Sequence, residues 1–400
     1  MSRAANFTIK GFLYQFNKSL IEILRSVGDG AISLEGVEDI DVHTNSGMTA
    51  IQCKYHEEAE RFRPSSIYEP VLQMMEHFCA NSQAQVRYIL FCHYPNMKDA
   101  PERATLRQYI QESIQSKNVD LQHLIAGLRG RVDVERFLGR FSMEAGAKLD
   151  ILVEQACALL EANGIPKGEI ETLAYPNAIQ MVATISAKQD PSERRITKLE
   201  FIESLTRIRK TAISRWTMAL TTRKKILEAK RKQLKTHLSK NSRLRCFLID
   251  IEQLDQHAEG FVPFVKDYLD KYHFKPTHTD TPIFCLSATK QTFNDLQIRL
   301  FQKGIIVADG FIGEHFDKSL FFREPLREKK NGEVKREFAM RMLRWEDHAA
   351  LLDEQKLDDL FIVGDLEIGS LETSDVEVER ISTTSLKELN YLIGVSDVYE

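Results

Sequence analysis

Two polar runs near the start of this 400-residue chain combine residue types that can hold a divalent cation beside a phosphate group. They are Leu34-Glu35-Gly36-Val37-Glu38-Asp39-Ile40-Asp41-Val42 and Ala50-Ile51-Gln52-Cys53-Lys54-Tyr55. A carboxylate and a second oxygen ligand hold Mg²⁺, a cation that prefers oxygen donors. Such a cation lowers the pKa of bound water and neutralises phosphoryl charge, while a nearby lysine stabilises developing negative charge. The combination predicts metal-dependent phosphodiester hydrolysis, as in a nuclease.

The two runs are expected to form a β-hairpin, because apolar and polar residues alternate in both. Asp39 and Asp41 then share one face of the sheet, and Gln52 and Lys54 also share a face. A loop with residues 46–47 at its tip would set Asp39 opposite Lys54. The same register would set Asp41 opposite Gln52, so that the four polar groups converge. A glycine bulge would shift this register by one residue, and an exposed strand with ordinary surface charges is the alternative for any single residue.

The pattern Asp39-Ile40-Asp41-Val42 followed by Gln52-Cys53-Lys54 resembles the Asp…Gln-x-Lys variant of the PD-(D/E)XK restriction-endonuclease-like fold, as in Mrr-like enzymes. It is most similar to the double-stranded DNA endonuclease domain of bacterial anti-phage effectors, found in CBASS nucleases and Lamassu nuclease subunits. Further similarity lies in Gly11-Phe12-Leu13-Tyr14-Gln15, in Glu35, in Ser65-Ser66-Ile67-Tyr68-Glu69-Pro70 and in Val86-Arg87-Tyr88-Ile89-Leu90-Phe91. The resemblance covers about the first 100 to 140 residues.

The resemblance implies a role for each matching residue. Asp39 would be the principal ligand of Mg²⁺ or Mn²⁺, and Gln52 would supply a neutral oxygen in place of the more usual glutamate. The backbone carbonyl of Cys53 would be a further ligand, and Lys54 would be the catalytic lysine. Asp41 competes with Asp39 for the role of metal ligand. The implied catalytic residues are Gln15, Glu35, Asp39, Gln52 and Lys54.

The periodicity of apolar residues predicts an α/β protein in three parts. Expected elements of the first part are a helix over residues 8–27, extended runs over 31–42 and 49–55, a helix over 64–81 and a strand over 86–93. This order fits a restriction-endonuclease-like nuclease domain over residues 1–140. Helical patterning continues through residue 163, which predicts a helical, basic linker or docking region over 141–240.

The third part, residues 241–400, is expected to be an α/β regulatory or partner-binding domain. Its predicted strands lie near residues 244–249, 282–286 and 360–363, and its predicted helices near 260–272 and 290–303. The scattered histidines of this half lack the spacing of metal ligands, and we expect them to be structural or surface residues.

Charge is distributed very unevenly around a net value of -4. Residues 194–245 hold 17 basic and 3 acidic side chains, whereas residues 351–400 hold 3 basic and 13 acidic ones. The basic run favours a surface for DNA or an acidic partner, and a solvated helix face is the equal alternative. The residues proposed for this contact are Arg223, Lys224, Lys225, Lys230, Arg231 and Lys232.

Composition excludes several other classes of protein. No apolar run is long enough to span a membrane and the start lacks the features of a signal peptide, so we expect a cytoplasmic protein. Six cysteines without a Cys-x-x-Cys pair fit free thiols in a reducing compartment rather than disulfides or a zinc site. The chain lacks the Gly-x-x-x-x-Gly-Lys-Ser/Thr loop, so ATP hydrolysis by a P-loop would require another subunit.

A free nuclease would damage its host, so its activity is expected to be controlled. In the favoured, Lamassu-like interpretation, an SMC-like ATPase with an accessory subunit holds the chain inactive until double-stranded DNA ends are recognised. In the CBASS-type alternative, the C-terminal region binds a cyclic oligonucleotide. Self-association on activation fits either scheme, because two active sites are needed to cut both strands. A second alternative is a catalytically degenerate fold that only binds DNA or a protein.

Overall fold

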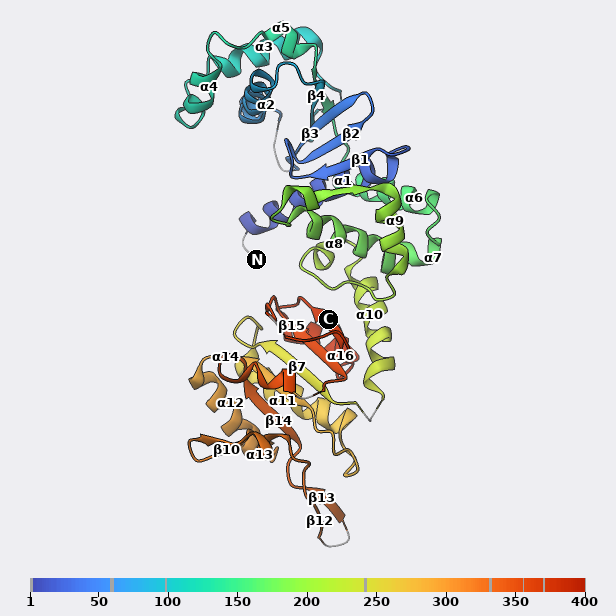
Figure 1. The fold of residues 1–400 in the computed structure, drawn as a ribbon, viewed down its shortest axis with the longest axis vertical. Coiled ribbons are helices and arrows are strands. Elements are labelled where there is room, and N and C mark those ends of the chain that lie inside the picture. The colour runs from blue at the N-terminus through green and yellow to red at the C-terminus, as the bar shows by residue number, and fades with distance from the viewer. Residues whose placement is uncertain are drawn as a thin grey trace. The chain divides into compact units, whose positions relative to one another are not determined.

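The computed structural model describes residues 3–57, 61–97, 99–240, 243–330, 333–354, 356–369 and 371–399 (Figure 1). They form two compact units, Met1–Arg209 and Lys210–Glu400, each built around its own six-stranded sheet. The α/β class expected from the sequence is confirmed. The predicted middle region, 141–240, is not a separate body, because its first part packs in the first unit and its last part in the second.

The first unit has a mixed sheet with the strand order β5-β4-β3-β2-β1-β6. Its strands are β1 (Ala31–Leu34), β2 (Ile40–Thr44), β3 (Gly47–Tyr55), β4 (Val86–His93), β5 (Phe141–Ala145) and β6 (Arg195–Thr197). β1, β2 and β3 pair in antiparallel fashion, and β3, β4 and β5 are parallel. β3 lies at the junction of the antiparallel and parallel halves and presents residues to both faces of the sheet.

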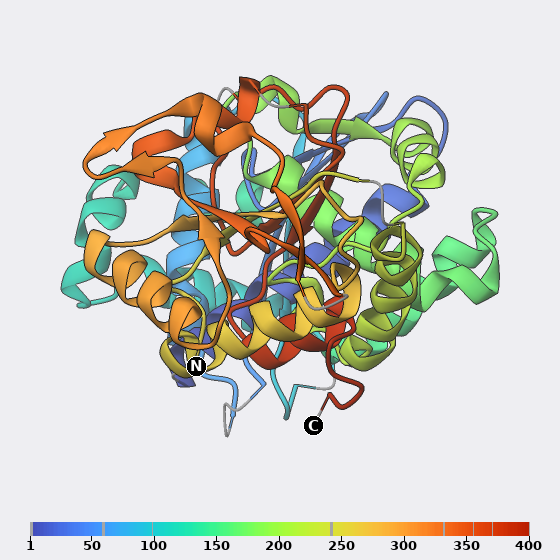
Figure 2. The ribbon, with the colours of Figure 1, turned by 90° about the horizontal axis from the view of Figure 1, so that it is seen from below.

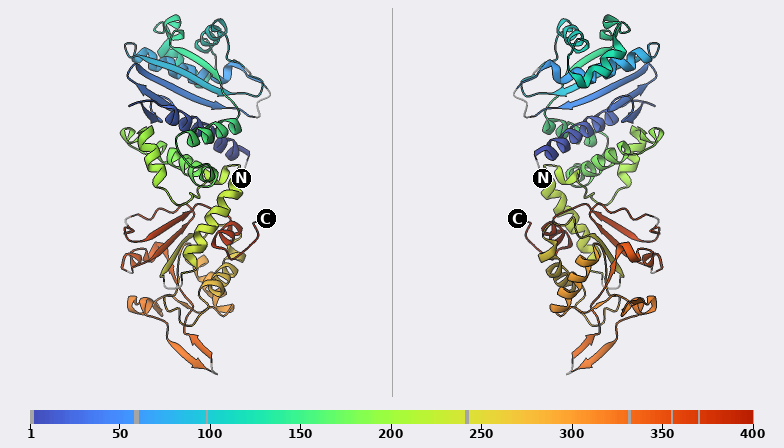
Figure 3. Two further views of the ribbon diagram at one scale, coloured as in Figure 1. Left: turned by 90° about the vertical axis from the view of Figure 1, so that its right-hand side faces the viewer. Right: turned by 90° about the vertical axis from the view of Figure 1, so that its left-hand side faces the viewer.

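Helices cover both faces of this sheet (Figures 1 and 3). α1 (Arg3–Arg25) packs against β3 and β1 on one face, together with α6 (Leu149–Ala162) and α8 (Tyr175–Ser186). The other helices of the unit are α2 (Tyr68–Ala80), α3 (Arg103–Ile114), α4 (Gln122–Leu128), α5 (Val134–Leu138), α7 (Lys167–Glu169) and α9 (Lys198–Arg207). α2 covers β4 on the opposite face, where Leu72, Met75 and Leu90 belong to one buried cluster.

The predicted order of helix, hairpin, helix and strand is confirmed at the start of the chain, and two details differ. The extended run 31–42 is interrupted by a turn at residues 35–39, because the chain reverses there between β1 and β2. The segment 141–145 was expected to be helical and forms β5 instead, because its alternating burial suits the sheet edge beside β4.

The β2–β3 hairpin is paired two residues away from the predicted register. Thr44 lies opposite Gly47, so the tip is the two-residue loop at 45–46. Gly47 has a φ of +134°, and a Cβ there would lie 2.6 Å from the carbonyl oxygen of Gln85, which explains a glycine after the tip. Asp41 therefore lies opposite Ala50 rather than Gln52. The predicted pairing of Asp39 with Lys54 is wrong for the same reason, although the alternation of faces is preserved.

The second unit contains an entirely parallel sheet with the order β16-β15-β7-β8-β14-β9. Its strands are β7 (Arg245–Asp250), β8 (Ile283–Ser287), β9 (Val307–Ala308), β14 (Met340–Arg344), β15 (Asp359–Val363) and β16 (Glu377–Ile381). β7, β8 and β15 confirm the three strands predicted from their continuous apolar runs, which suit a sheet buried on both faces. Short two-stranded ribbons are formed by β10 (Phe311–Ile312) with β11 (His315–Phe316) and by β12 (Arg327–Lys330) with β13 (Glu333–Arg336).

The helices of this unit are α10 (Arg223–Leu238), α11 (His257–Tyr272), α12 (Lys290–Gln302), α13 (Lys318–Phe322), α14 (Trp345–His348), α15 (Leu351–Glu354) and α16 (Leu386–Ile393). α11 packs with α12 and α16 along one side of the sheet, as Figure 2 shows. There Phe247, Phe284 and Phe361 stack across adjacent strands. None of the helices in the described part of the chain combines the length and apolar character of a membrane span.

Candidate active site

The turn between β1 and β2 brings several carboxylates to the carboxyl end of β3. The backbone N–H of Glu35 donates to the carbonyl of Asp39 (3.0 Å), and that of Gly36 donates to the carbonyl of Glu38 (3.0 Å). Glu35 adopts a left-handed conformation with φ of 51°. The Asp41 carboxylate accepts hydrogen bonds from the backbone of Val37 (2.7 Å) and Glu38 (3.3 Å). The turn is therefore fixed from within.

Asp39 follows this turn and caps the end of β3. One carboxylate oxygen, Oδ2, accepts both the side-chain amide of Gln52 (2.7 Å) and the backbone N–H of Cys53 (2.7 Å). β2 begins at Ile40, opposite Ile51, so Cys53 lies beyond the ladder and the Asp39 carboxylate replaces a strand partner. The structure thus brings together Asp39 and Gln52, whereas the predicted register paired Asp39 with Lys54 and Gln52 with Asp41.

Cys53 and Lys54 extend the site along β3. The N–H and C=O of a strand residue point to the same side, so the carbonyl of Cys53 also faces the side of Asp39. Lys54 shares a sheet face with Gln52 because two residues separate successive positions on one face. Its positive charge lowers the pKa of both Glu38 and Asp39, although burial outweighs it in each case.

α1 contributes Gln15, whose side-chain amide donates to the Glu35 carboxylate. The helix is held on the sheet by Tyr14, whose ring stacks on Tyr55 at 4.6 Å and on Phe91 at 5.6 Å. Arg194, 159 residues later in the chain, donates a hydrogen bond to the carbonyl of Glu35 (2.8 Å). The sequence-predicted residues Gln15, Glu35, Asp39, Gln52 and Lys54 are therefore linked by contacts or shared charge effects.

Burial makes the negative charge of this cluster costly. Desolvation raises the pKa of Asp39 to about 6, against hydrogen bonds from Cys53 and Gln52 that lower it. Desolvation also raises the pKa of Glu38 to about 8, and the neighbouring carboxylates of Asp39 and Asp41 add to the effect. The pKa of Glu35 is raised by burial as well. Buried carboxylates that favour a proton also favour a bound cation, so the donor set fits Mg²⁺ or Mn²⁺.

Glu38 is the member of the cluster that was not singled out from the sequence. It is 8% exposed, and its pKa responds to Asp39, Asp41 and Lys54 together. No ion pair to Glu38 occurs among the described residues. The sequence signal for Glu38 was the density of acids in Glu35-Gly36-Val37-Glu38-Asp39. In a regular strand, Glu38 and Asp39 would point to opposite faces, so alternation did not predict that both side chains belong to one cluster.

Asp41 has a structural role in the turn. Both of its oxygens accept backbone N–H groups, and a Cβ on Gly36 would collide with its carboxylate. Burial raises the pKa of Asp41, whereas His43 and His77 lower it. The pKa of Asp39, also raised by burial, is raised further by Glu35 and lowered by Lys54. Of the two aspartates considered as metal ligands, Asp39 fits the role better, because it lies beside Gln52 and Cys53 while both oxygens of Asp41 are used by the turn.

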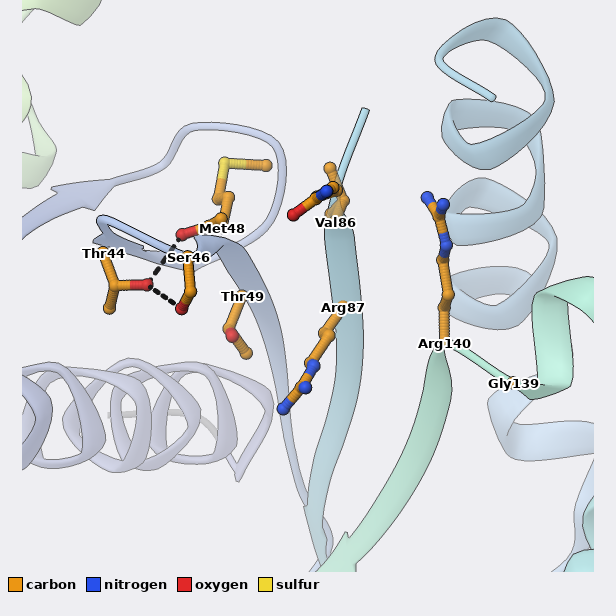
Figure 4. Close-up of a pocket in the computed structure, with 10 residues that line it drawn as sticks. Thr44, Ser46, Met48, Thr49, Val86, Arg87, Gly139 and Arg140 are labelled. Carbon is orange, nitrogen blue, oxygen red and sulfur yellow. Dashed lines mark hydrogen bonds between the residues drawn. The ribbon is translucent and has the colours of Figure 1, made fainter. Parts of the chain in front are cut away.

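A hollow of about 210 Å³ lies at the opposite, amino end of β3 and β4 (Figure 4). Thr44 and Ser46 line one side, and their hydroxyls lie 3.0 Å apart. Arg87 and Arg140 line the other side (Figure 4). None of the predicted catalytic residues borders this hollow, so we do not assign it to the active site.

The basic run 194–245 is matched in part to the acidic C-terminal segment, because several of its members from Lys210 onward form ion pairs with that segment within the second unit. Lys230 is 2% exposed and pairs with Glu379. Two other members of the proposed binding set also form ion pairs, Arg223 with Glu388 and Arg231 with Asp397. Lys230 therefore has no surface from which to contact DNA. Lys224, Lys225 and Lys232 are exposed on α10.

A second cluster of possible metal ligands, His237, Asp359 and Glu377, lies in the second unit. Arg243 donates three hydrogen bonds to the Asp359 carboxylate, at 2.6, 2.9 and 3.0 Å. Arg245, which is fully buried, also contacts Asp359 at 3.2 Å. These guanidinium groups already neutralise the acids, so the cluster is an ion-pair network rather than a metal site.

No protein-family model matches the chain, and no curated protein matches it. Among solved structures, the chain is similar to the Acinetobacter baumannii Cap4 SAVED/CARF-domain containing receptor with the cyclic trinucleotide 2'3'3'-cAAA. The identity is 10% and the TM-score 0.30, over 96% of this chain and 91% of the receptor. The Moraxella osloensis Cap4 receptor gives 11% identity and a TM-score of 0.25, over 99% and 94% of the two chains. These values are too low to transfer a ligand or an activity.

Proposed function

We propose that this protein is a metal-dependent endonuclease that cuts double-stranded DNA, with its active site at the carboxyl end of β3. The observation that carries the proposal is the convergence of Asp39, Gln52 and the Cys53 backbone, with Lys54 and a buried Glu38 beside them. This arrangement agrees with the resemblance of about the first 100 to 140 residues to PD-(D/E)XK nucleases.

Each residue has a definable task in this proposal. Asp39 and the Cys53 carbonyl would hold Mg²⁺ or Mn²⁺, and the Gln52 amide would turn its oxygen towards the ion. When bound, the ion supplies an activated water and neutralises charge on the phosphate. Lys54 holds a positive charge beside the reacting phosphate. Gln15 and Glu35 position the turn, because the amide of Gln15 reaches the Glu35 carboxylate from α1.

The test is plasmid cleavage by the full-length protein with Mg²⁺ or Mn²⁺, with and without a chelator. Asp39→Ala and Lys54→Ala should each reduce cleavage at least about 100-fold, the usual effect of removing a group that stabilises transition-state charge. Lys10→Ala is the matched control, because Lys10 is an exposed lysine of the same unit that pairs with Glu57. Full activity of Lys54→Ala would overturn the assignment.

The degenerate alternative is separated by the same assay. A protein that only binds DNA would show no metal-dependent cleavage under any activating condition, while a gel-shift assay would still detect a complex. Retained DNA binding with no cleavage would therefore refute the nuclease proposal and support a protein that only binds DNA. Cleavage that appears only at high protein concentration would instead favour self-association of two active sites.

For control of the nuclease, the geometry favours a small ligand bound by the second unit, which is the CBASS-type alternative. A cavity of about 560 Å³ lies at the carboxyl ends of β9 and β14, beside α12, and the carboxyl edge is where parallel α/β sheets commonly bind ligands. Its lining combines the aromatic rings of Phe293 and Phe311, the amides of Asn294 and Gln297, the cations Lys290 and Arg344 and the acids Asp309, Glu314 and Asp347. Arg344 pairs with Asp347, so Lys290 is the cation left for a phosphate, and the rings and amides suit a nucleotide base.

The Lamassu-like scheme depended more on the basic run as a docking element. Because Arg223, Lys230 and Arg231 are used in ion pairs within the unit, this support is weaker than it seemed from the sequence. An SMC-like ATPase partner is retained as the second candidate. A pull-down of the chain with such a subunit would establish it independently of any ligand.

The ligand proposal is tested by calorimetric titration with cyclic trinucleotides, the ligand class bound by the Cap4 receptor named above. Lys290→Glu and Phe293→Ala should weaken binding at least tenfold and prevent activation of cleavage. Lys303→Glu on the same helix–loop segment is the matched control, since Lys303 is exposed and does not line the cavity. Binding that is unaffected by both cavity variants would contradict this assignment.

A further inference from the structure

The ribbon formed by β12 and β13 is a two-stranded arm that projects from the second unit (Figures 1 and 3). It pairs with no other strand in the described part of the chain. An isolated two-stranded ribbon is marginally stable in water, because little apolar surface is buried between its strands. Here Leu326 and Val334 are 64% and 41% exposed, so apolar packing does not explain the arm.

The base of the arm is fixed to the body of the unit. Arg336 donates to the carbonyl oxygen of His278 (2.6 Å) and to that of His273. Next to it, Glu337 forms a bidentate ion pair with Arg323, with both N···O distances 2.6 Å. The arm therefore leaves the unit in a defined direction, although its strands are exposed.

The two faces of the arm differ in charge. The register places Arg327 opposite Arg336 and Lys329 opposite Val334 on one face, which carries no acid. The other face carries the cross-strand pair of Glu328 with Lys335. Arg327 and Lys329 are exposed and form no ion pair with any described residue.

The acid-free face is destabilising for the arm on its own. Like charges directly opposite each other weaken an antiparallel pair, and Arg327 faces Arg336 in this way. The repulsion would be relieved by a polyanion that lies along both strands. Exposed lysines also discourage edge-to-edge pairing with another sheet, so a second copy of the chain is a poor occupant.

We propose that this face of the arm binds the phosphate backbone of duplex DNA. The inference rests on the proposed function, which makes duplex DNA the substrate, and adds a contact outside the active site. The major groove of B-form DNA admits a two-stranded β-ribbon, so the width of the arm suits this partner. Arg327 and Lys329, two residues apart on one face, supply the positive charge for this contact.

The test is a salt titration of duplex DNA binding by the full-length protein carrying Asp39→Asn, in chelator, so that no cleavage occurs. Reversal of both Arg327 and Lys329 to Glu should lower the slope of log affinity against log salt by about 2, since each phosphate contact contributes about 0.9. The charge-preserving exchange of Arg327→Lys with Lys329→Arg should leave the slope unchanged.

The matched control reverses Lys303 and Lys387, which are exposed lysines elsewhere on the second unit. This control should bind DNA with the parental slope. An unchanged slope in the arm variant would overturn the proposal and indicate that the arm serves another partner, such as an acidic protein. The two proposals can fail separately, because this assay measures binding without cleavage. If the unsubstituted chain never cleaves DNA but the salt slope still depends on the arm, only the proposed nuclease function is refuted.

Discussion

At the scale of residues, the candidate site depends on carboxylates with different tasks in one turn. Asp39 faces β3 and receives hydrogen bonds from Gln52 and Cys53, whereas Asp41 holds the turn itself. The difference arises because the strand pairing stops at Ile40, which releases Asp39 from regular alternation. Two aspartates that look equivalent in sequence therefore have distinct physical roles.

The Asp39 carboxyl predicts a specific dependence of stability on pH in the absence of metal. Burial raises its pKa from the ordinary 3.8 to about 6, so the folded state retains a proton that the unfolded chain releases. The contribution of Asp39 to stability should therefore fall as the pH rises from about 4 to about 6 and then level off. Urea unfolding of Asp39→Asn in chelator should lack this component. Equal pH slopes for the two proteins would show that the carboxyl is not buried as described.

Asp41→Ala should lower the free energy of unfolding by about 1–3 kcal/mol, because the backbone N–H groups of Val37 and Glu38 lose their acceptor. Gly36→Ala should also destabilise, since the added methyl group collides with the Asp41 carboxylate. Thermal melts of each variant and of Gly36→Ala/Asp41→Ala measure the coupling. The double variant should lose less than the sum of the two single losses, and strict additivity would argue against this contact.

At the scale of elements, α10 shows how a strongly basic helix can be an internal element. Its apolar residues Ile226, Leu227 and Leu234 are fully buried, and Lys230 lies among them with Glu379 of β16 as its partner. The acids of β16 and α16 come from the acidic end of the chain, so part of the basic excess of the middle segment is neutralised within the unit.

The buried pair predicts a double-mutant result. Lys230→Met should cost about 3–5 kcal/mol, because Glu379 would remain buried with a weakened set of partners. Adding Glu379→Leu should recover most of that loss, since replacing both members of a buried ion pair by apolar groups is often nearly neutral. Urea unfolding of the two single variants and the double variant measures the coupling energy. A coupling near zero would mean that Lys230 escapes to solvent.

At the scale of the whole molecule, the chain consists of two units with separate sheets and separate cores. The candidate metal ligands all lie in Met1–Arg209, and the proposed ligand cavity lies in Lys210–Glu400. Binding to one unit stabilises that unit directly, by an amount set by ligand concentration relative to its dissociation constant.

Calorimetry should therefore resolve two unfolding transitions, of which only one responds to metal. Saturation with Mn²⁺ at 100 times its dissociation constant should stabilise the first unit by about 2.7 kcal/mol and leave the other transition in place. Asp39→Asn should remove the shift without removing the transition. A metal-induced shift that survives in Asp39→Asn would place the cation elsewhere.

The sequence by itself determined much of the architecture and most of the candidate site. Continuous apolar runs predicted β7, β8 and β15, and helical periodicity predicted α1, α11 and α12, because local patterns report burial directly. The residue types in the two polar runs also identified Asp39, Gln52 and Lys54, since cation binding and phosphate chemistry require those functional groups.

Tertiary structure alone decided which of these groups meet. The hairpin register depends on the conformation of the Asn45–Ser46 tip, and a shift of two residues there exchanged the partner of Asp39 without changing the pattern of faces. The burial of Glu38 and the pairing of Lys230 with Glu379, 149 residues away, depend on contacts between distant segments. Composition reports how much charge a segment carries, but only packing determines whether that charge faces water, a cation or another side chain.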